Sequence, residues 1–375
     1  MYKILQLIKS IQLGGAEVVA FNLSEYCKFN YPDKFEFIVV EVHRTIDAYS
    51  IEKKKELISK NIRSICLGKS SKRISLLMKS FILGYYILKE KPDIIHSHTD
   101  IPDFVLSNTL RIFSLMHFKT PKIVRTIHNA ELWPSHPRFG KYTEVAFKND
   151  WIVGVSEVAL KAYQSLRIKN KLPVSTNQQV IYNGCNVPIK KEHPFKIDKE
   201  KINIAYCGRF EYQKGTDILI ERLKVINKRF NDIFVFHLIG NGSYIQDVLK
   251  LSKLNANVLV YQAVPNISDK LYAFDYIIMP SRFEGLVLIS IEASFSKVPV
   301  IAAVAPGLSE TLPTDWPLQF HLENENELLL IFEKIKNQEY DLDVLKNQAF
   351  SIVSVKFSQS KVINAYSNLY LEIIE

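Results

Sequence analysis

Short apolar runs alternate with longer amphipathic stretches along the whole chain. In the first half the runs lie at residues 3–9, 35–40, 94–98, 122–128 and 151–156, and the stretches between them have helical periodicity. Apolar runs of this length are typical of buried strands, and strands that alternate with helices run parallel to one another. The sequence therefore predicts an α/β fold with a parallel, doubly wound sheet.

The second half repeats this pattern after a break. Further strand-like runs lie at 202–209, 233–239, 258–261, 276–279 and 298–303, and a helix is predicted at 358–375. The break at 187–195 is highly charged and has a proline near each end, as linkers often do. We therefore expect an N-terminal domain at 1–188, a C-terminal domain at 189–356 and a final helix at 357–375. The length of 375 residues also favours two domains, because one core rarely grows so large.

Two glutamates stand at the ends of one predicted loop and helix. Glu284 follows the strand at 276–279 and precedes Gly285, which lets backbone approach a ligand, while Glu292 projects from the next helix. Open α/β sheets bind ligands at the carboxyl ends of their strands. Charged residues eight apart also occur on solvated helix faces, so other motifs must decide between the two interpretations.

Two cations are predicted at the same edge of the second sheet. Arg209 leaves the strand at 202–209, and Lys214 comes just before the next helix. Cations at this place would bind an anionic ligand and stabilise negative charge that grows on it during a reaction.

Gly15 belongs to a Gly-Gly turn between the first strand and the first helix. Backbone N–H groups and the helix dipole favour a phosphate there, although a tight turn without a ligand is an equal alternative. The turn lacks the G-x-G-x-x-G spacing of dinucleotide sites.

Histidines follow two strands of the first domain. His96 and His98 end one strand and His128 ends the next, and at such positions a histidine is more often structural than catalytic. The only close D-x-D, a sequence associated with metal-bound nucleotide sugars, is 341–343. It opens a late helix, and we interpret it as a helix cap.

Together and in this order, these motifs resemble those of retaining glycosyltransferase family 4, whose members have the GT-B fold. The resemblance extends over nearly the whole chain, and its motifs are Gly14-Gly15-Ala16-Glu17, Thr126-Ile127-His128-Asn129, Asn183-Gly184, Gly208-Arg209 with Lys214-Gly215, and the two glutamates. It implies one binding role for each residue: the ribose for Glu292, the diphosphate for Arg209 and Lys214, a phosphate for Gly15, the sugar for Glu284 and His128, and the donor-binding loop for Gly285 and Leu286. Two positions depart from the family pattern: Val287, where glycine or proline is usual, and Pro306, which replaces a glycine.

The resemblance also implies an architecture and a reaction. Two Rossmann-like domains would face a cleft, with the C-terminal helix packed back on the N-terminal domain. A hexosyl or N-acetylhexosaminyl group would pass, with retention and without a metal or cofactor, from a nucleoside diphosphate sugar to a glycan or lipid-linked acceptor. UDP is favoured over GDP, and the setting would be bacterial surface polysaccharide synthesis: O-antigen, capsule or lipopolysaccharide. A non-catalytic GT-B subunit of a transferase complex and a sugar-nucleotide epimerase of the same fold are the alternatives.

Composition and charge indicate where such a protein works. The four cysteines have no C-x-x-C spacing, and the chain begins directly with a strand, so we expect a cytoplasmic protein without a transmembrane span. Residues 1–190 hold 28 Lys and Arg against 16 Asp and Glu, and nine of these cations lie between Lys53 and Lys79. This stretch is either a solvated face or a patch for an anionic membrane surface at the inner side of the cytoplasmic membrane. No nucleic-acid recognition motif accompanies the charge.

Overall fold

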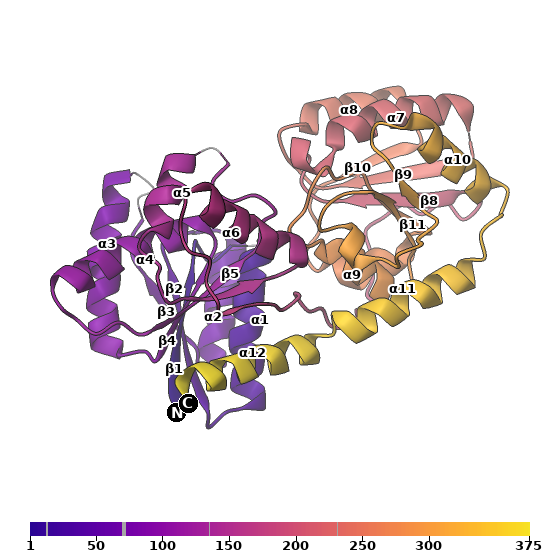
Figure 1. Ribbon diagram of the computed structural model, residues 1–375. Coiled ribbons are helices and arrows are strands. Elements are labelled where there is room, and N and C mark those ends of the chain that lie inside the picture. The colour runs from indigo at the N-terminus through magenta and orange to yellow at the C-terminus, as the bar shows by residue number, and fades with distance from the viewer. Residues whose placement is uncertain (13, 70–72, 135, 231) are drawn as a thin grey trace. The chain divides into compact units, whose positions relative to one another are not determined.

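The computed structural model describes residues 1–12, 14–69, 73–134, 136–230 and 232–375, and the chain divides into two compact units (Figure 1). Unit 1 comprises Met1–Gly184 and Ser360–Glu375, and unit 2 comprises Cys185–Gln359. The sequence predicted these divisions at residues 188 and 356, and the structure has them at 184 and 359.

Within the described residues, unit 1 is built on a parallel sheet in the order β3-β2-β1-β4-β5-β6-β7. Its strands are β1 (Tyr2–Ile8), β2 (Phe35–Glu41), β3 (Arg63–Cys66), β4 (Ile94–His98), β5 (Lys122–Ile127), β6 (Trp151–Gly154) and β7 (Gln178–Val180). Ile4 of β1 pairs with Phe37 of β2 on one side and with Ile94 of β4 on the other. The strand order reverses between β1 and β4, so the carboxyl ends of these two strands form the expected ligand edge.

Helices cover both faces of this sheet and enclose two cores. They are α1 (Gly15–Asn30), α2 (Ala48–Ser59), α3 (Arg73–Glu90), α4 (Asp100–Leu115), α5 (Pro137–Glu144), α6 (Glu157–Lys169) and α12 (Gln359–Ile374). On one face Phe21 of α1 is buried together with Tyr366 and Tyr370 of α12. On the other face the core contains Leu83 of α3 and Phe113 of α4. The last helix of the chain is therefore part of a core of unit 1.

Unit 2 repeats the design with strands in the order β10-β9-β8-β11-β12-β13. These are β8 (Ile202–Cys207), β9 (Phe234–Ile239), β10 (Val258–Tyr261), β11 (Tyr276–Met279), β12 (Val300–Ala303) and β13 (Gln319–Phe320). The helices are η1 (Tyr212–Lys214), α7 (Thr216–Arg229), α8 (Ile245–Leu254), η2 (Ile267–Ala273), α9 (Leu288–Phe295), η3 (Ser309–Thr311), α10 (Glu325–Lys336) and α11 (Leu342–Lys356). Here the strand order reverses between β8 and β11, so the ligand edge of unit 2 follows these strands.

The predicted fold class is confirmed, because both sheets are parallel and doubly wound. Each strand predicted from an apolar run is present within about two residues of its expected bounds. β3 and β13 were not predicted, because these short edge strands contain few buried residues and so lack a continuous apolar run. The predicted helix cap is also confirmed: a carboxylate oxygen of Asp341 accepts hydrogen bonds from the backbone N–H groups of Asp343 and Val344.

A buried ion cluster holds the helices of unit 1 to its sheet. Arg125 of β5 is 1% exposed, and its guanidinium contacts Asp103 of α4 at 2.8 Å, Glu144 of α5 at 2.5 Å and Asp150 at 3.0 Å. Arg167 of α6 lies 3.3 Å from Glu144. Buried charges are tolerated only when they are paired in this way, so the cluster fixes α4 and α5 against β5.

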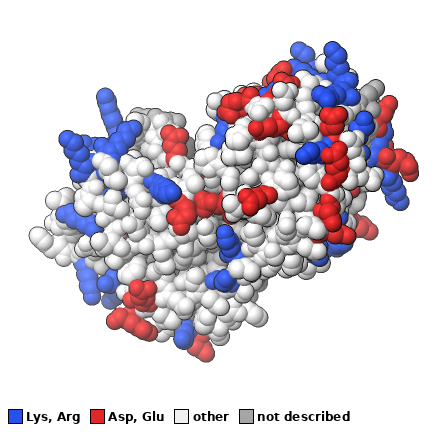
Figure 2. Space-filling view, turned by 45° about the vertical axis from the view of Figure 1, so that its right-hand side comes forward, with Lys and Arg blue, Asp and Glu red and all other residues white. Residues whose placement is uncertain are grey.

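The predicted basic stretch is partly paired on the surface of unit 1. Four of its nine cations contact carboxylates: Lys53 and Lys60 contact Glu25 at 2.7 Å, Lys54 contacts Glu41 at 2.6 Å and Arg63 contacts Glu90 at 2.7 Å. Lys79 is buried, and Lys72 lies outside the described residues. Figure 2 shows charges of both signs interspersed over unit 2, at the upper right, and wide uncharged areas on unit 1.

Candidate active site

The ligand edge of unit 2 brings a lysine and a glutamate together. Lys214 follows β8 and ends η1, while Glu284 lies in the loop after β11. The Lys214 Nζ atom is 2.6 Å from Glu284 Oε1, and the Glu284 side chain is almost fully buried. Two residues 70 positions apart thus form an ion pair at the point where the strand order reverses.

Gln213 connects this pair to Arg209. Its Nε2 donates to the carbonyl of Phe283 at 3.2 Å and to Glu284 Oε2 at 3.5 Å, and its Oε1 accepts from Arg209 Nη2 at 3.3 Å. Arg209 is otherwise exposed, so its guanidinium can reach a ligand. The sequence prediction missed Gln213, for which the only available signal was its position beside Lys214.

Two glycines allow the loops of the site to approach each other closely. Gly215 has φ +66°, and a Cβ at this position would lie 1.8 Å from the carbonyl oxygen of Pro280. Gly307 has φ +73°, and its Cβ would lie 2.1 Å from the carbonyl oxygen of Glu284. Neither conformation nor spacing suits a residue with a side chain, which explains the Lys214-Gly215 motif physically.

The two departures from the family pattern have structural explanations. Pro306 provides a carbonyl oxygen that accepts from the backbone N–H of Glu284 at 2.9 Å, so the loop after β12 still supports the Glu284 loop. Val287 is the N-cap residue of α9, and its side chain is buried in the core of unit 2. Its side chain therefore packs inside the unit.

Arg282 links the loop after β11 to the residues that follow β8. Its guanidinium makes two 2.7 Å hydrogen bonds with the carboxylate of Asp217 in the first turn of α7 and lies 3.7 Å from the ring centre of Tyr212. Its backbone N–H donates to the carbonyl of Gln213 at 2.9 Å. The loop after β11 is therefore tied to the turn that carries Lys214, a contact that no local sequence signal indicated.

Glu292 provides a carboxylate without a partner. It lies in the second turn of α9, and burial, together with the charge of Asp269, raises the pKa of its carboxyl to about 7. Among the described residues, no donor lies within hydrogen-bond distance of this carboxylate, and no direct contact joins it to Lys214 or Glu284. Burial raises the pKa of the Cys207 thiol, and the charge of Glu292 raises it further. The other two predicted donor-loop residues lie close by in sequence: Gly285 is buried and Leu286 is partly exposed.

The predicted residues of unit 1 lie at the ligand edge of the first sheet. Gly15 begins α1 after β1, and a Cβ there would meet no neighbouring atom within 4 Å, whereas a Cβ at the N-cap residue Gly14 would lie 2.3 Å from a carboxylate oxygen of Glu17. His128 follows β5, and its Nε2 lies 3.1 Å from Nδ1 of His98, which ends β4. Burial lowers the pKa of His128 to about 3, so its ring is neutral at neutral pH.

A chain of hydrogen bonds orients the His128 ring. His98 Nε2 lies 2.7 Å from Gln6 Oε1, and the Gln6 amide N–H donates to Tyr370 OH at 3.1 Å. With the Gln6 amide in this orientation, His98 donates through Nε2 and accepts from His128 Nε2–H. His128 then has an unprotonated Nδ1, which has no partner among the described residues and can accept a hydrogen bond from a ligand hydroxyl. His96 is fully buried between Thr126 and Tyr370, in agreement with a structural role.

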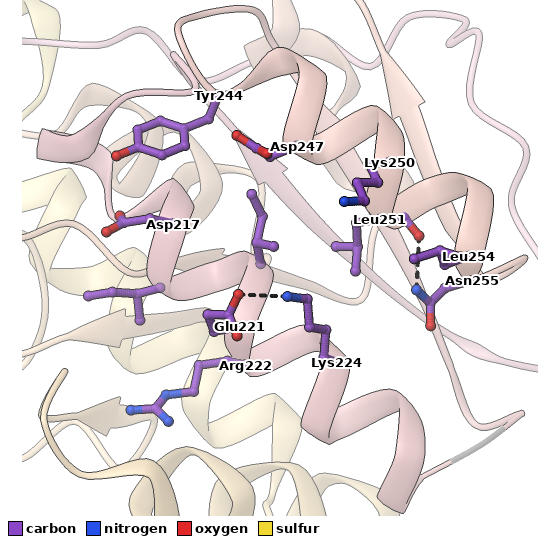
Figure 3. Close-up of a pocket in the computed structure, with 12 residues that line it drawn as sticks. Asp217, Glu221, Arg222, Lys224, Tyr244, Asp247, Lys250, Leu251, Leu254 and Asn255 are labelled. Atoms are coloured by element: carbon purple, nitrogen blue, oxygen red, sulfur yellow. Dashed lines mark hydrogen bonds and ion pairs between the residues drawn. The ribbon is translucent and has the colours of Figure 1, made fainter.

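The surface hollow in Figure 3 is a different place. It has a volume of about 520 Å³ and lies between α7 and α8 of unit 2. On its wall Lys224 and Glu221 form an ion pair, with 2.7 Å between Lys224 Nζ and Glu221 Oε1. None of the predicted site residues lines it.

Comparisons with known proteins agree with this fold. Residues 201–329 match the family model of glycosyl transferases group 1. An uncharacterized 41.2 kDa protein in the cps region of Klebsiella pneumoniae is 27% identical over 316 residues, which is 81% of this chain and 86% of that protein. The O-antigen biosynthesis glycosyltransferase WclY of Escherichia coli is 24% identical over 74% of this chain and 78% of its own.

The crystal structure of Anabaena Alr3699/HepE in complex with UDP-glucose has a TM-score of 0.78 with this chain at 17% identity, over 99% of this chain and 100% of that chain. The architecture is thus that of the GT-B glycosyltransferases, with two Rossmann-like domains. With the matching domain and the named relatives, this fold supports a glycosyltransferase. No helix in the described part of the chain is long and apolar enough to cross a membrane.

Proposed function

We propose that this chain is a retaining, metal-independent glycosyltransferase of family 4. It transfers a hexosyl or N-acetylhexosaminyl group from a nucleoside diphosphate sugar to a glycan or lipid-linked acceptor in bacterial surface polysaccharide synthesis. Its main support is the 2.6 Å pair of Lys214 and Glu284 at the ligand edge of unit 2, inside the segment that matches the group 1 glycosyltransferases. Relatives named for O-antigen and capsule synthesis favour the polysaccharide setting, and a structural neighbour bound to UDP-glucose favours UDP.

In this proposal the cations of unit 2 stabilise the leaving group. As the bond between the sugar C1 and the phosphate oxygen breaks, negative charge grows on the diphosphate, and Lys214 and Arg209 contact it. The acceptor oxygen forms the new bond to C1 on the same face of the sugar, and its proton passes to the departing phosphate oxygen. No side chain is then required as general base. Glu284, next to Lys214, accepts hydrogen bonds from sugar hydroxyls.

Glu292 binds the ribose. A mostly buried carboxylate with no donor of its own is a costly feature unless a ligand supplies the donors, and two adjacent ribose hydroxyls do so. Gly15 and His128 keep the roles that the family resemblance implies, the former binding a phosphate and the latter a sugar hydroxyl. A lipid-linked acceptor would place the protein at the inner, anionic surface of the cytoplasmic membrane.

A thermal-shift screen tests the donor assignment. The parent protein is heated with UDP, GDP and their sugars, and the cognate nucleotide at about 100 times its dissociation constant should stabilise the fold by about 2.7 kcal/mol. Glu292→Gln and Lys214→Ala should reduce the shift, and Lys224→Ala, on the same unit but outside the site, should leave it unchanged. If no nucleotide shifts the melting temperature of the parent, the donor assignment is wrong.

Product analysis then separates transfer from the alternatives. The transferase should release the nucleoside diphosphate only when an acceptor glycan is present. Conversion of the donor to an epimer without acceptor would instead identify an epimerase. Nucleotide binding without either reaction, over a panel of lipid-linked and free glycans, would favour the non-catalytic subunit.

A further inference from the structure

Helix α3 exposes a continuous apolar face. Its side chains between 37 and 62% exposed lie one to four positions apart and therefore on one side of the helix: Leu77, Met78, Phe81, Ile82, Tyr85 and Leu88. The opposite side packs on α4, where Thr109 Oγ1 donates to the carbonyl of Ser80 at 2.9 Å and a Cβ at Gly84 would lie 3.2 Å from the Phe113 ring. This packing fixes the apolar face outward, and soluble proteins rarely leave such a face without a partner.

The end of α4 extends this face. Because Ser80 meets Thr109 and Gly84 meets Phe113, α3 and α4 run in the same general direction, and the end of α4 lies beside the second half of α3. Leu115, Met116 and Phe118 follow at the end of α4 and are exposed, and the Phe118 ring packs 5.5 Å from that of Phe113. We call α3 together with residues 115–118 the α3 face.

Positive charges predominate around the α3 face. Residues 67–89 and 104–130 contain no Asp or Glu. The exposed cations within or beside these segments are Lys69, Lys89, Lys91, Lys119 and Lys122. Asp93, just after α3, is an exposed carboxylate and accepts a hydrogen bond from the backbone N–H of Lys3. Glu90, at the end of α3, is held by Arg63 at 2.7 Å and by Lys3 at 3.5 Å. The lysines here thus differ from the glutamate-paired cations of α2.

We propose that the α3 face docks on a bilayer that contains anionic lipid. The apolar side chains enter the boundary between headgroups and acyl chains, and the surrounding lysines contact the headgroups. A second copy of this chain is a poorer partner, because it would bring the same positive charge against itself. This docking deepens the membrane-surface part of the proposed function, and it places the contact at α3 instead of at the glutamate-paired cations of α2.

Vesicle sedimentation tests the docking on the full chain without donor or acceptor. The parent should bind phosphatidylcholine vesicles that contain phosphatidylglycerol at least about ten-fold better than phosphatidylcholine alone, and salt should weaken this binding. Leu77→Gln with Phe81→Gln should weaken binding at least about ten-fold. The matched control is Ile58→Gln with Ile168→Gln, which removes two equally exposed isoleucines of unit 1 away from α3 and should bind as the parent does.

Three results would overturn the docking: parent binding that does not depend on anionic lipid, a Leu77→Gln/Phe81→Gln variant that binds like the parent, or a chain that forms dimers broken by this variant and ignores vesicles. Melting temperatures of both double variants, compared with the parent, verify that they fold. Vesicle binding without transferase activity would contradict the proposed function and leave the docking supported.

Discussion

Affinity for a nucleotide sugar should rise with pH, because the Glu292 carboxyl must ionise to accept the ribose hydroxyls. Its pKa of about 7 in the free protein means that about one tenth of the molecules carry the carboxylate at pH 6 and about nine tenths at pH 8. If only the ionised form binds the ribose, the dissociation constant should be about ten-fold larger at pH 6 than at pH 8. Calorimetric titration with a nucleotide sugar measures this, because its diphosphate does not ionise between these pH values.

Two variants test whether the Glu292 carboxylate causes this pH dependence of affinity. Glu292→Gln keeps the shape but not the charge, so its affinity should be lower at pH 8 and should lose the pH dependence. Glu292→Ala should weaken binding about a hundred-fold or more at pH 8, since each hydrogen bond to a charged group contributes roughly 1.5–3 kcal/mol. Turnover at saturating donor should fall less. Two results would show that Glu292 does not bind the ribose. The parent would have the same affinity at pH 6 and pH 8, or the affinity of Glu292→Gln would depend on pH as strongly as that of the parent.

The same carboxyl should affect stability in the opposite sense. Because its pKa is raised in the folded state, the protonated form favours folding, and this contribution is lost as the pH rises from about 4.5 to about 7. Glu292→Gln should therefore melt at a higher temperature than the parent at pH 8 and at nearly the same temperature at pH 4. A higher melting temperature combined with weaker binding is the pattern expected of a residue kept for its ligand.

Three further predictions follow from the site and the core. Lys214→Ala should lower kcat by about 10²–10³ and weaken donor binding only modestly, because its charge matters most as the diphosphate leaves; a variant that loses affinity but keeps kcat would contradict this role. Turnover should be unchanged in EDTA, since Lys214 and Arg209 supply the positive charge, and a loss restored by Mn²⁺ or Mg²⁺ would disprove metal independence. Arg125→Met should lower the free energy of unfolding by about 3–5 kcal/mol in urea titrations, because it leaves the buried carboxylates of Asp103 and Asp150 without their cation and Glu144 with Arg167 alone. The exposed pair of Lys224 and Glu221 is the control: Lys224→Met should cost less than about 1 kcal/mol, and equal losses would show that burial of the cluster matters little.

The amino-acid sequence by itself determined the elements and the edge on which the site lies. The period of apolar residues is a local property, so the strands could be predicted from runs such as 94–98 and 276–279. Parallel strands then place their carboxyl ends at one edge, and residues that follow a strand, such as Lys214 and Glu284, had to lie there whatever the details of packing. The fold class and the position of these two residues were therefore predictable.

Only the tertiary structure decided which side chains meet and how water is excluded from them. The bridge by Gln213, the brace by Arg282 and the burial of Val287 depend on contacts between residues far apart in the chain. The pKa of Glu292 depends on how completely its neighbours remove water. The basic stretch shows the same limit: its lysines read as a charged patch in sequence, but glutamates of α1 and β2 neutralise several of them. Periodicity fixes which face of an element is apolar, whereas pairing and desolvation arise only when distant elements pack together.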